Sequence, residues 1–180
     1  MTELPKKMRK VEIVDPNDID QLAAEVYINK AVTDFWKQKV EDSDLVMLAV
    51  KDNGKYVARL SIWLKPDEPE INEYYPSLPL IKALIVNEDN RRQGHAKALM
   101  DSAHDWLIIS GYDKVGLGVL EDNYNAIELY NNLGYKKHSV GSSEIFKTSW
   151  LEVLPNGDLK KQTVDTVFML KELQNDDRTA

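Results

Sequence analysis

The sequence predicts a single α/β domain in which a mixed β-sheet carries helices on both faces. Three observations predict this fold class. The first half holds two β-rich segments joined at Asp52-Asn53-Gly54, and Asn-Gly is a strong hairpin signal. The second half alternates strand, helix and strand, and no repeat or linker divides the chain. At 180 residues the chain suits one core, so we expect a domain over residues 1–174 and a polar tail over 175–180.

The elements of the first half follow from apolar spacing. Lys10–Val14 predicts a strand, and Asp15-Pro16-Asn17-Asp18 supplies turn and N-cap chemistry for a helix. The remaining segments are a second helix and two strands, expected over residues 32–40, 45–50 and 56–64. Residues 65–78 contain three prolines and four acids, which predicts a loop. This loop is either a solvated connection, the simpler interpretation, or a lid over an acceptor site.

The second half shows regular alternation. Leu80–Val86 is an apolar run that predicts a buried strand, and residues 94–109 show helical spacing closed by Gly111. A strand over 114–120 and a helix over 123–133, ended by Gly134, come next. The rest, to about Leu173, predicts two strands around a turn at residues 155–158. The pattern therefore contains seven strands.

Composition excludes several function classes. The chain has no cysteine, which removes disulfides, thiolate metal sites and cysteine nucleophiles. Its net charge of −7 argues against a nucleic-acid partner and mildly favours a cationic small molecule. The N-terminus lacks a signal-peptide core and no apolar run could span a bilayer, so we expect a cytoplasmic protein without a membrane partner. The three histidines are scattered, and we expect no metal site.

The stretch that carries the chemistry runs from a buried strand through a polar turn into a helix. It comprises Leu84, Ile85, Val86 and then Arg91, Arg92, Gln93, Gly94, His95, Ala96 and Lys97. A helix start leaves about four main-chain amides unpaired and carries partial positive charge, which suits an anion. Gly94 would allow close approach of the backbone, Ala96 leaves room, and the arginines add charge. A diphosphate is the ligand that this turn fits best. Other phosphate motifs are absent, since no P-loop occurs and Gly116-Leu117-Gly118 lacks a third glycine.

A second motif strengthens this interpretation. Asn123, Ala126, Leu129, Tyr130, Gly134 and Tyr135 follow the next strand with the spacing N-x-x-A-x-x-L-Y-x-x-x-G-[FY]. With the turn's [QR]-x-x-G-x-[GA] pattern about 30 residues earlier, the chain resembles the GNAT superfamily of acetyl-CoA-dependent N-acetyltransferases. The resemblance implies a six- to seven-stranded, mostly antiparallel sheet. It also implies transfer of an acetyl group from acetyl-CoA, as co-substrate, to a primary amine.

The resemblance implies roles for particular residues. Leu84–Val86 would splay from the strand at 114–119 and bind the pantetheine arm, while residues 91–97 would surround the pyrophosphate. Asn123 and Ala126 would contact the cofactor, and Tyr130 would stand beside the thioester sulfur as the general acid. A phenol can donate to the departing thiolate, whose conjugate acid has a pKa near 8.5 if it resembles cysteine. Without cysteine, direct attack in a ternary complex is expected.

Several alternatives stay open at this stage. In the branch that acetylates ribosomal protein N-termini, a glutamate lies twelve residues before the motif tyrosine, and here that position is Gly118. Glu70, Glu73, Glu121, Asp122 or a water chain could serve as the base. The acceptor is a small molecule or peptide, and a homodimer through the C-terminal strands is a prospect by family analogy. The competing functions are a non-catalytic acyl-CoA sensor and a module for a different nucleotide.

Overall fold

The computed structural model describes residues 10–26 and 29–174. One mixed sheet runs through the molecule in the order β1-β2-β3-β4-β5-β8-β6, and β7 pairs with β8 off this path. β4 and β5 pair in parallel, and the other strand pairs are antiparallel. The strands are β1 (Val11–Ile13), β2 (Leu45–Asp52), β3 (Lys55–Trp63), β4 (Leu80–Val86), β5 (Lys114–Val119), β6 (Lys136–Lys137), β7 (Ile145–Val153) and β8 (Leu159–Glu172).

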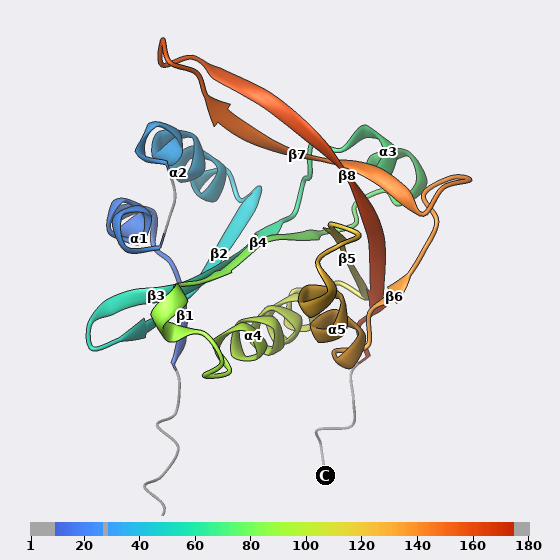
Figure 1. Ribbon diagram of the computed structural model, residues 1–180, viewed down its shortest axis with the longest axis horizontal. Coiled ribbons are helices and arrows are strands. Elements are labelled where there is room, and N and C mark those ends of the chain that lie inside the picture. The colour runs from blue at the N-terminus through green and yellow to red at the C-terminus, as the bar shows by residue number, and fades with distance from the viewer. Residues whose placement is uncertain (1–9, 27–28, 175–180) are drawn as a thin grey trace, which may run out of the picture.

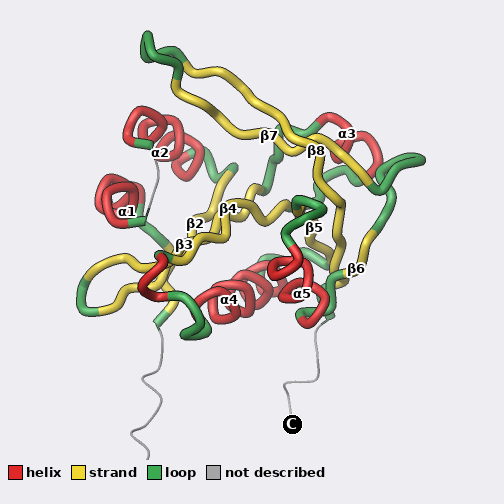
Figure 2. Tube along the Cα trace, viewed as in Figure 1, coloured by secondary structure: helices red, strands yellow, loops and turns green. Residues whose placement is uncertain are grey.

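Helices cover both faces of the sheet (Figure 1). α1 and α2 lie together on one side, α4 and α5 lie on the other, and the β7–β8 ribbon extends past α2. The helices are α1 (Ile19–Glu25), α2 (Thr33–Glu41), α3 (Pro69–Tyr74), α4 (His95–Ile109) and α5 (Tyr124–Asn132). Short 3-10 turns precede α1, α2 and α4, and the helix, strand and loop segments can be followed in Figure 2.

The alternation of side chains along β3 explains why both faces are covered. Ala58, Leu60 and Ile62 pack with α4 in one apolar cluster, while Trp63 packs with α1 and α2 residues in another. A strand buried on both faces is nearly all apolar, because each face loses contact with water. β3 follows this pattern except at Arg59 and Ser61, which are nonetheless buried.

The predicted fold class is confirmed, with two corrections to its details. Residues 65–78 are not a plain loop, because α3 forms within them: Pro69 occupies its first turn and Ile71 is fully buried. The sheet has eight strands rather than six or seven, since β6 is a two-residue strand added at the edge of β8. A pairing that short leaves no periodic pattern. The proposed tail over 175–180 lies outside the described residues.

Candidate active site

The sheet opens between its two parallel strands. In the β4–β5 pair, Leu80 lies opposite Gly116 and Ile81 lies opposite Leu117, and the pairing then stops. Beyond this point β4 stays paired with β3 as far as Val86, and β5 stays paired with β8 as far as Val119. The expected splay between these strands is therefore confirmed. Beyond the pairing, the main-chain groups of β4 that face β5 have no strand beside them, so an extended ligand can hydrogen-bond to them.

A bulge in β4 accompanies the opening. Ala83 has φ of 54°, a left-handed conformation that non-glycine residues rarely adopt, and the β3–β4 register shifts between Arg59 and Ser61. A bulge bends its strand and increases the local twist. Ala83 is exposed and Leu84, Ile85 and Val86 are only partly buried, although β4 is a central strand. The open side of β4 is thus accessible at the residues expected to bind the pantetheine arm.

In the part of the chain that the structure describes, the amides of Arg92, Gln93, Gly94, Ala96 and Lys97 around the start of α4 have no acceptor. Gly94 caps the helix with φ of 81°, and Arg92 is also left-handed with φ of 58°. Within the described residues, the first amide of α4 with a main-chain acceptor is that of Ala98, which donates to Gly94 O at 3.1 Å. The preceding amides of this turn and the partial positive charge of the helix end form a potential anion site.

The side chains of the turn are held mainly by local contacts. Arg91 Nε donates to Val86 O at 3.3 Å and Lys97 Nζ pairs with Asp101 at 2.6 Å. Gln93 Nε2 donates to Asp89 O at 3.3 Å. His95, the first residue of α4, is buried at 5% exposure, unlike its exposed neighbours Gly94 and Lys97. The structure thus brings residues 91–97 together in one turn.

α5 brings the second motif to the opening from the other side. Asn123 Oδ1 caps the helix by accepting from Ala126 N at 3.3 Å, which ties up one of the two polar ends of its amide. Asn123 is exposed and Ala126 is half-buried. Helix capping is therefore an established role of Asn123 in this structure, and contact with a cofactor would have to come from the remaining Nδ2 group.

Tyr130 points into the core from α5. Its side chain is 9% exposed, and its ring centroid lies 5.8 Å from that of Tyr135. Burial raises the pKa of Tyr130 to about 12, because the phenolate would lose its hydration. Within the described residues its hydroxyl has no hydrogen-bond partner. The group therefore remains protonated at neutral pH and is available as a donor.

Gly118 lies where β5 meets the β7–β8 hairpin. A Cβ at this position would approach the hydroxyls of Thr148 and Thr166 to 2.5 Å and the Phe146 ring to 2.9 Å. Those threonine hydroxyls hydrogen-bond each other at 2.7 Å across the hairpin. A glutamate side chain at residue 118 is excluded by this contact, so packing explains the departure from the ribosomal-protein branch.

We expect Gly118→Ala to lower the free energy of unfolding by about 1–3 kcal/mol, since an added methyl group overpacks a tight contact. Urea denaturation measures the change. In a Thr148→Ala/Thr166→Ala background the same substitution should cost clearly less, because the clashing hydroxyls are gone. An equal cost in both backgrounds would contradict this account of Gly118.

The four carboxylates expected as candidate bases are all at the surface. Glu70 and Glu73 are exposed on α3, and Glu121 and Asp122 are exposed in the turn before α5. Glu70 accepts only a long bond, from Lys147 N at 3.4 Å. None of the four is desolvated, so their surroundings single out none of them as a base.

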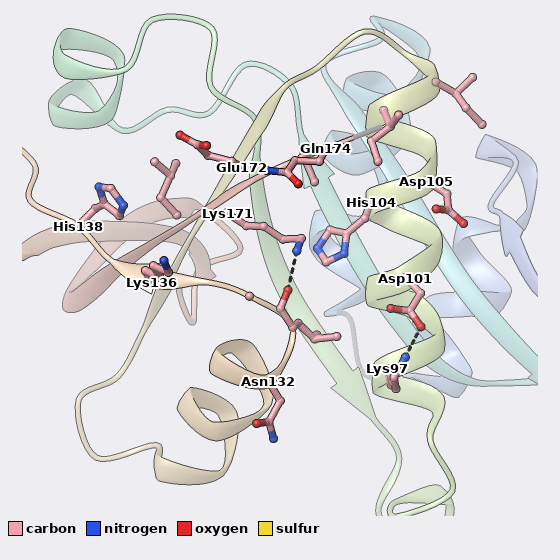
Figure 3. A pocket seen from close by; sticks show the side chains of 16 residues that line it. Lys97, Asp101, His104, Asp105, Asn132, Lys136, His138, Lys171, Glu172 and Gln174 are labelled. Carbon is pink, nitrogen blue, oxygen red and sulfur yellow. Dashed lines mark hydrogen bonds and ion pairs between the residues drawn. The ribbon is translucent and has the colours of Figure 1, made fainter. Parts of the chain in front are cut away.

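A polar cavity of about 980 Å³ lies between α4, the end of α5 and the end of β8 (Figure 3). Of residues 91–97, Lys97 alone lines it. Lys171 Nζ donates to Leu133 O at 2.7 Å, and His104 extends from α4 toward Lys171. His104 Nε2 also hydrogen-bonds the Tyr135 hydroxyl at 2.8 Å. Burial lowers the pKa of His104 to about 4, and the positive charge of Lys171 adds to this effect.

His104 makes stability depend on pH. An unfolded histidine has a pKa near 6.5, so between about pH 6.5 and 4 the unfolded chain binds a proton that the folded protein does not. The contribution of neutral His104 to the free energy of unfolding is complete above pH 6.5. It falls by about 3 kcal/mol as the pH drops to 4. Denaturation of the wild type and His104→Gln across this range measures it. A difference between the two that does not change with pH would contradict this assignment.

A second cavity, of about 790 Å³, lies on the other face of the sheet, under α2 and the β7 strand. Ala83 and Ile85 of the opened strand line it, together with Arg59, Trp63 and Lys82. Neither this cavity nor the polar one is lined by Tyr130. Trp36 and Trp63 both line this second cavity.

Sequence reasoning missed the charged residues around the second cavity. Arg59 interrupts a strand in which eight of nine residues are buried, and Lys82 interrupts the apolar run of β4. Glu68, 1% exposed, accepts from Lys82 Nζ and from Ser149 Oγ at 2.9 Å. Arg59 and Lys82 could have been found from the sequence as charged residues inside buried strands, because burying a charge is costly unless it has a partner or a function. Glu68 carried no such signal in a segment rich in acids.

Two features of the described residues bear on other kinds of site. No group of three His, Asp or Glu side chains there is arranged to hold a metal ion. None of the helices in residues 10–26 and 29–174 is long and apolar enough to cross a bilayer.

A mixed sheet that opens between two parallel strands, beside the start of a helix, is the arrangement that the resemblance to the GNAT superfamily implies. The model of the GNAT acetyltransferase family matches residues 14–135, more than half of the chain. The chain therefore belongs to the GNAT acetyltransferase family. No curated protein shows a significant sequence match to it.

Solved structures share the fold at low sequence identity. The ribosomal-protein-S18-alanine N-acetyltransferase from Escherichia coli superposes with a TM-score of 0.64 at 16% identity, covering 96% of this chain and 99% of that one. A GNAT family acetyltransferase from Elizabethkingia anophelis, with acetyl-CoA bound, gives 0.61 at 16% identity over 93% and 99%. A GNAT acetyltransferase from Staphylococcus aureus Mu50 gives 0.63 at 14% over 92% and 99%. These similarities establish the fold.

Proposed function

We propose that the protein transfers the acetyl group of acetyl-CoA to a primary amine by direct attack in a ternary complex. The observation that carries the proposal is the combination of the β4–β5 opening with the unpaired amides at the start of α4. Both features belong to one continuous segment, because the unpaired part of β4 leads through a short turn to the start of α4. The first suits an amide-containing arm and the second suits linked phosphates.

The residues present fit this co-substrate. Gly94 and Ala96 keep the start of α4 free of bulky side chains, and Arg92 is exposed beside it. Arg91 and Lys97 contribute positive charge although each already has a local partner. An approaching diphosphate would gain charge-assisted hydrogen bonds from amides that lose no protein partner in exchange. This is the basis for assigning Arg91–Lys97 to the pyrophosphate, and Leu84–Val86 with Asn123 and Ala126 to the arm.

The co-substrate supplies an acyl thioester, which is already activated toward an amine. The chain's residues then have to orient the amine and manage protons. The amine nitrogen bonds to the acyl carbon, the carbon–sulfur bond breaks, and the amine releases a proton. None of the four expected carboxylates lines the second cavity, whereas Asp67 and Glu152 do, so the proton passes to water or to one of these two side chains. Tyr130 donates its hydroxyl proton to the sulfur and is reprotonated from solvent.

A measurement of CoA release with a panel of primary amines tests the proposal. The panel contains amino acids, peptides, polyamines and aminoglycosides, and free thiol is followed in the presence of acetyl-CoA. We expect saturable CoA release with at least one class of amine. Tight binding of acetyl-CoA with no release above hydrolysis for any amine would instead favour an acyl-CoA sensor. Displacement of acetyl-CoA by ATP would favour a module for another nucleotide.

A further inference from the structure

The cavity under α2 is built by three parts of the chain that meet at the opened strand. Its floor is β3 and β4, one wall is α2, and the other wall is β7. Leu151 and Val153 of β7 pack on the apolar cluster formed with α2, which fixes the hairpin over this side. Because Ala83 and Ile85 line the cavity, it reaches the strand proposed to hold the reactive arm of the co-substrate.

Strand register places two cations on the cavity side of the sheet. Arg59 and Trp63 are four residues apart on β3 and so share one face. Lys82 pairs across from Ser61, between them, and therefore lies on the same face. Arg59 is 5% exposed, and burial lowers the pKa of its guanidinium to about 10, so it stays charged at neutral pH. Its positive charge lies at the floor of the cavity.

The ammonium of Lys82 is held in a defined place. It forms an ion pair with Glu68, which is fixed in turn by Ser149 on β7, and it lies 5.4 Å from the centroid of the Trp63 ring. Burial lowers the pKa of Lys82, and the pairing with Glu68 opposes that shift. A cation fixed in this way is preorganised for an anion, since little side-chain entropy is lost when one binds.

The cavity lining as a whole is basic and rich in indole. Five basic and two acidic side chains line it, in a protein whose net charge is −7. Trp36, Trp63 and Trp150 line it as well. The rings of Trp36 and Trp63 pack edge to face, with their centroids 5.3 Å apart. Their Nε1 atoms are buried and have no acceptor within the described residues. Buried donors without acceptors are costly, and a ligand rich in acceptor oxygens would satisfy them.

We propose that the acceptor is an amine that also carries a carboxylate and an apolar, aromatic-sized body. The carboxylate binds at Arg59 and Lys82, the body packs against the tryptophans, and the amine faces the opening at Ala83. This inference rests on the proposed acetyl transfer and names its substrate class. It also reverses the expectation of a cationic acceptor, which came from the net charge, because the lining of the cavity has the opposite balance.

Matched acceptors test the carboxylate directly. Tryptophan is compared with tryptamine and tryptophanamide, phenylalanine with phenethylamine, and spermidine serves as the cation. CoA release gives kcat/KM, and calorimetry with the corresponding N-acetylated products, in the presence of CoA, gives affinity without turnover. We expect the carboxylate-bearing member of each pair to be favoured by about 10- to 100-fold in both measurements, the range expected for hydrogen bonds to a charged group.

Two variants locate the preference in the cavity. Arg59→Met keeps the volume and removes the charge, and Glu68→Gln/Lys82→Met removes the ion pair together, because Lys82→Met alone would leave a buried carboxylate unpaired. Each should reduce the preference for the carboxylate, measured as the ratio of kcat/KM for tryptophan to that for tryptamine, at least about fivefold. Lys55→Met is the control for a lost charge, because Lys55 is exposed on β3, the strand that carries Arg59. This variant should keep the preference for the carboxylate.

The outcomes separate this inference from the function on which it rests. Turnover of tryptamine or spermidine at or above the rate with tryptophan would overturn the carboxylate assignment and leave acetyl transfer standing. Absence of CoA release with every amine would overturn acetyl transfer, and calorimetry would then decide the cavity's preference. Equal affinity for N-acetyltryptophan and its amide, or an unchanged preference in both variants, would overturn the inference.

Discussion

Gly94→Val is expected to raise the Kd for acetyl-CoA by about 30- to 100-fold. Gly94 has φ of 81°, which a β-branched residue adopts only with strain, and its amide lies in the unpaired turn before α4. Shifting the turn would weaken one or two charge-assisted hydrogen bonds, worth about 2–3 kcal/mol together. Calorimetric titration of the folded variant with acetyl-CoA measures the effect.

Gly111→Val is the matched control for this substitution. Gly111 follows the other end of α4 with φ of 88°, and an added Cβ would have no heavy atom within 4 Å. The two variants should lose similar stability, because each forces a left-handed conformation on valine. Gly111→Val should bind acetyl-CoA as the wild type does. Similar affinity losses in both variants would show that strain, rather than the turn, explains the result.

Tyr130→Phe is expected to lower kcat at least about tenfold, which corresponds to about 1.4 kcal/mol of transition-state stabilisation. The substitution removes a hydroxyl that has no partner among the described residues, so the packing of the ring is kept. Because burial raises the pKa of Tyr130 to about 12, the hydroxyl is protonated from pH 6 to 9. The loss should therefore be constant over that range.

Tyr135→Phe serves as the control, since Tyr135 is the neighbouring core tyrosine and its hydroxyl is bound to His104. It should cost stability but leave kcat unchanged. Steady-state kinetics with the best amine of the panel compares the two. An unchanged kcat in Tyr130→Phe would remove Tyr130 as the acid without disturbing the assignment of the co-substrate.

Much of the fold could be predicted because local signals coincided with the tertiary structure. Asn53 and Gly54 both have positive φ at the β2–β3 turn, as their hairpin signal predicts. Gly111 and Gly134 end α4 and α5 in the left-handed conformation expected of helix ends. The turn at residues 91–97 could also be predicted, because the strand, the polar turn and the helix that follows it each have a clear local pattern in the sequence.

The parts that could not be predicted depend on contacts between distant segments. α3 was missed because Pro69 and its acidic neighbours favour a loop, and the helix is held by Ile71, which packs with residues of β4, β7 and β8. Glu68 could not be separated from the exposed Glu70 and Glu73, because its burial depends on Lys82 and Ser149, which follow it by 14 and 81 residues. The second cavity likewise forms only when β7 packs beside α2.

The most direct test of the account is the structure of the protein crystallised with acetyl-CoA. The account predicts that the diphosphate oxygens accept hydrogen bonds from main-chain amides within residues 92–97, with the pantetheine arm along Leu84–Val86. A diphosphate bound elsewhere, or a turn whose amides are paired within the protein, would contradict it.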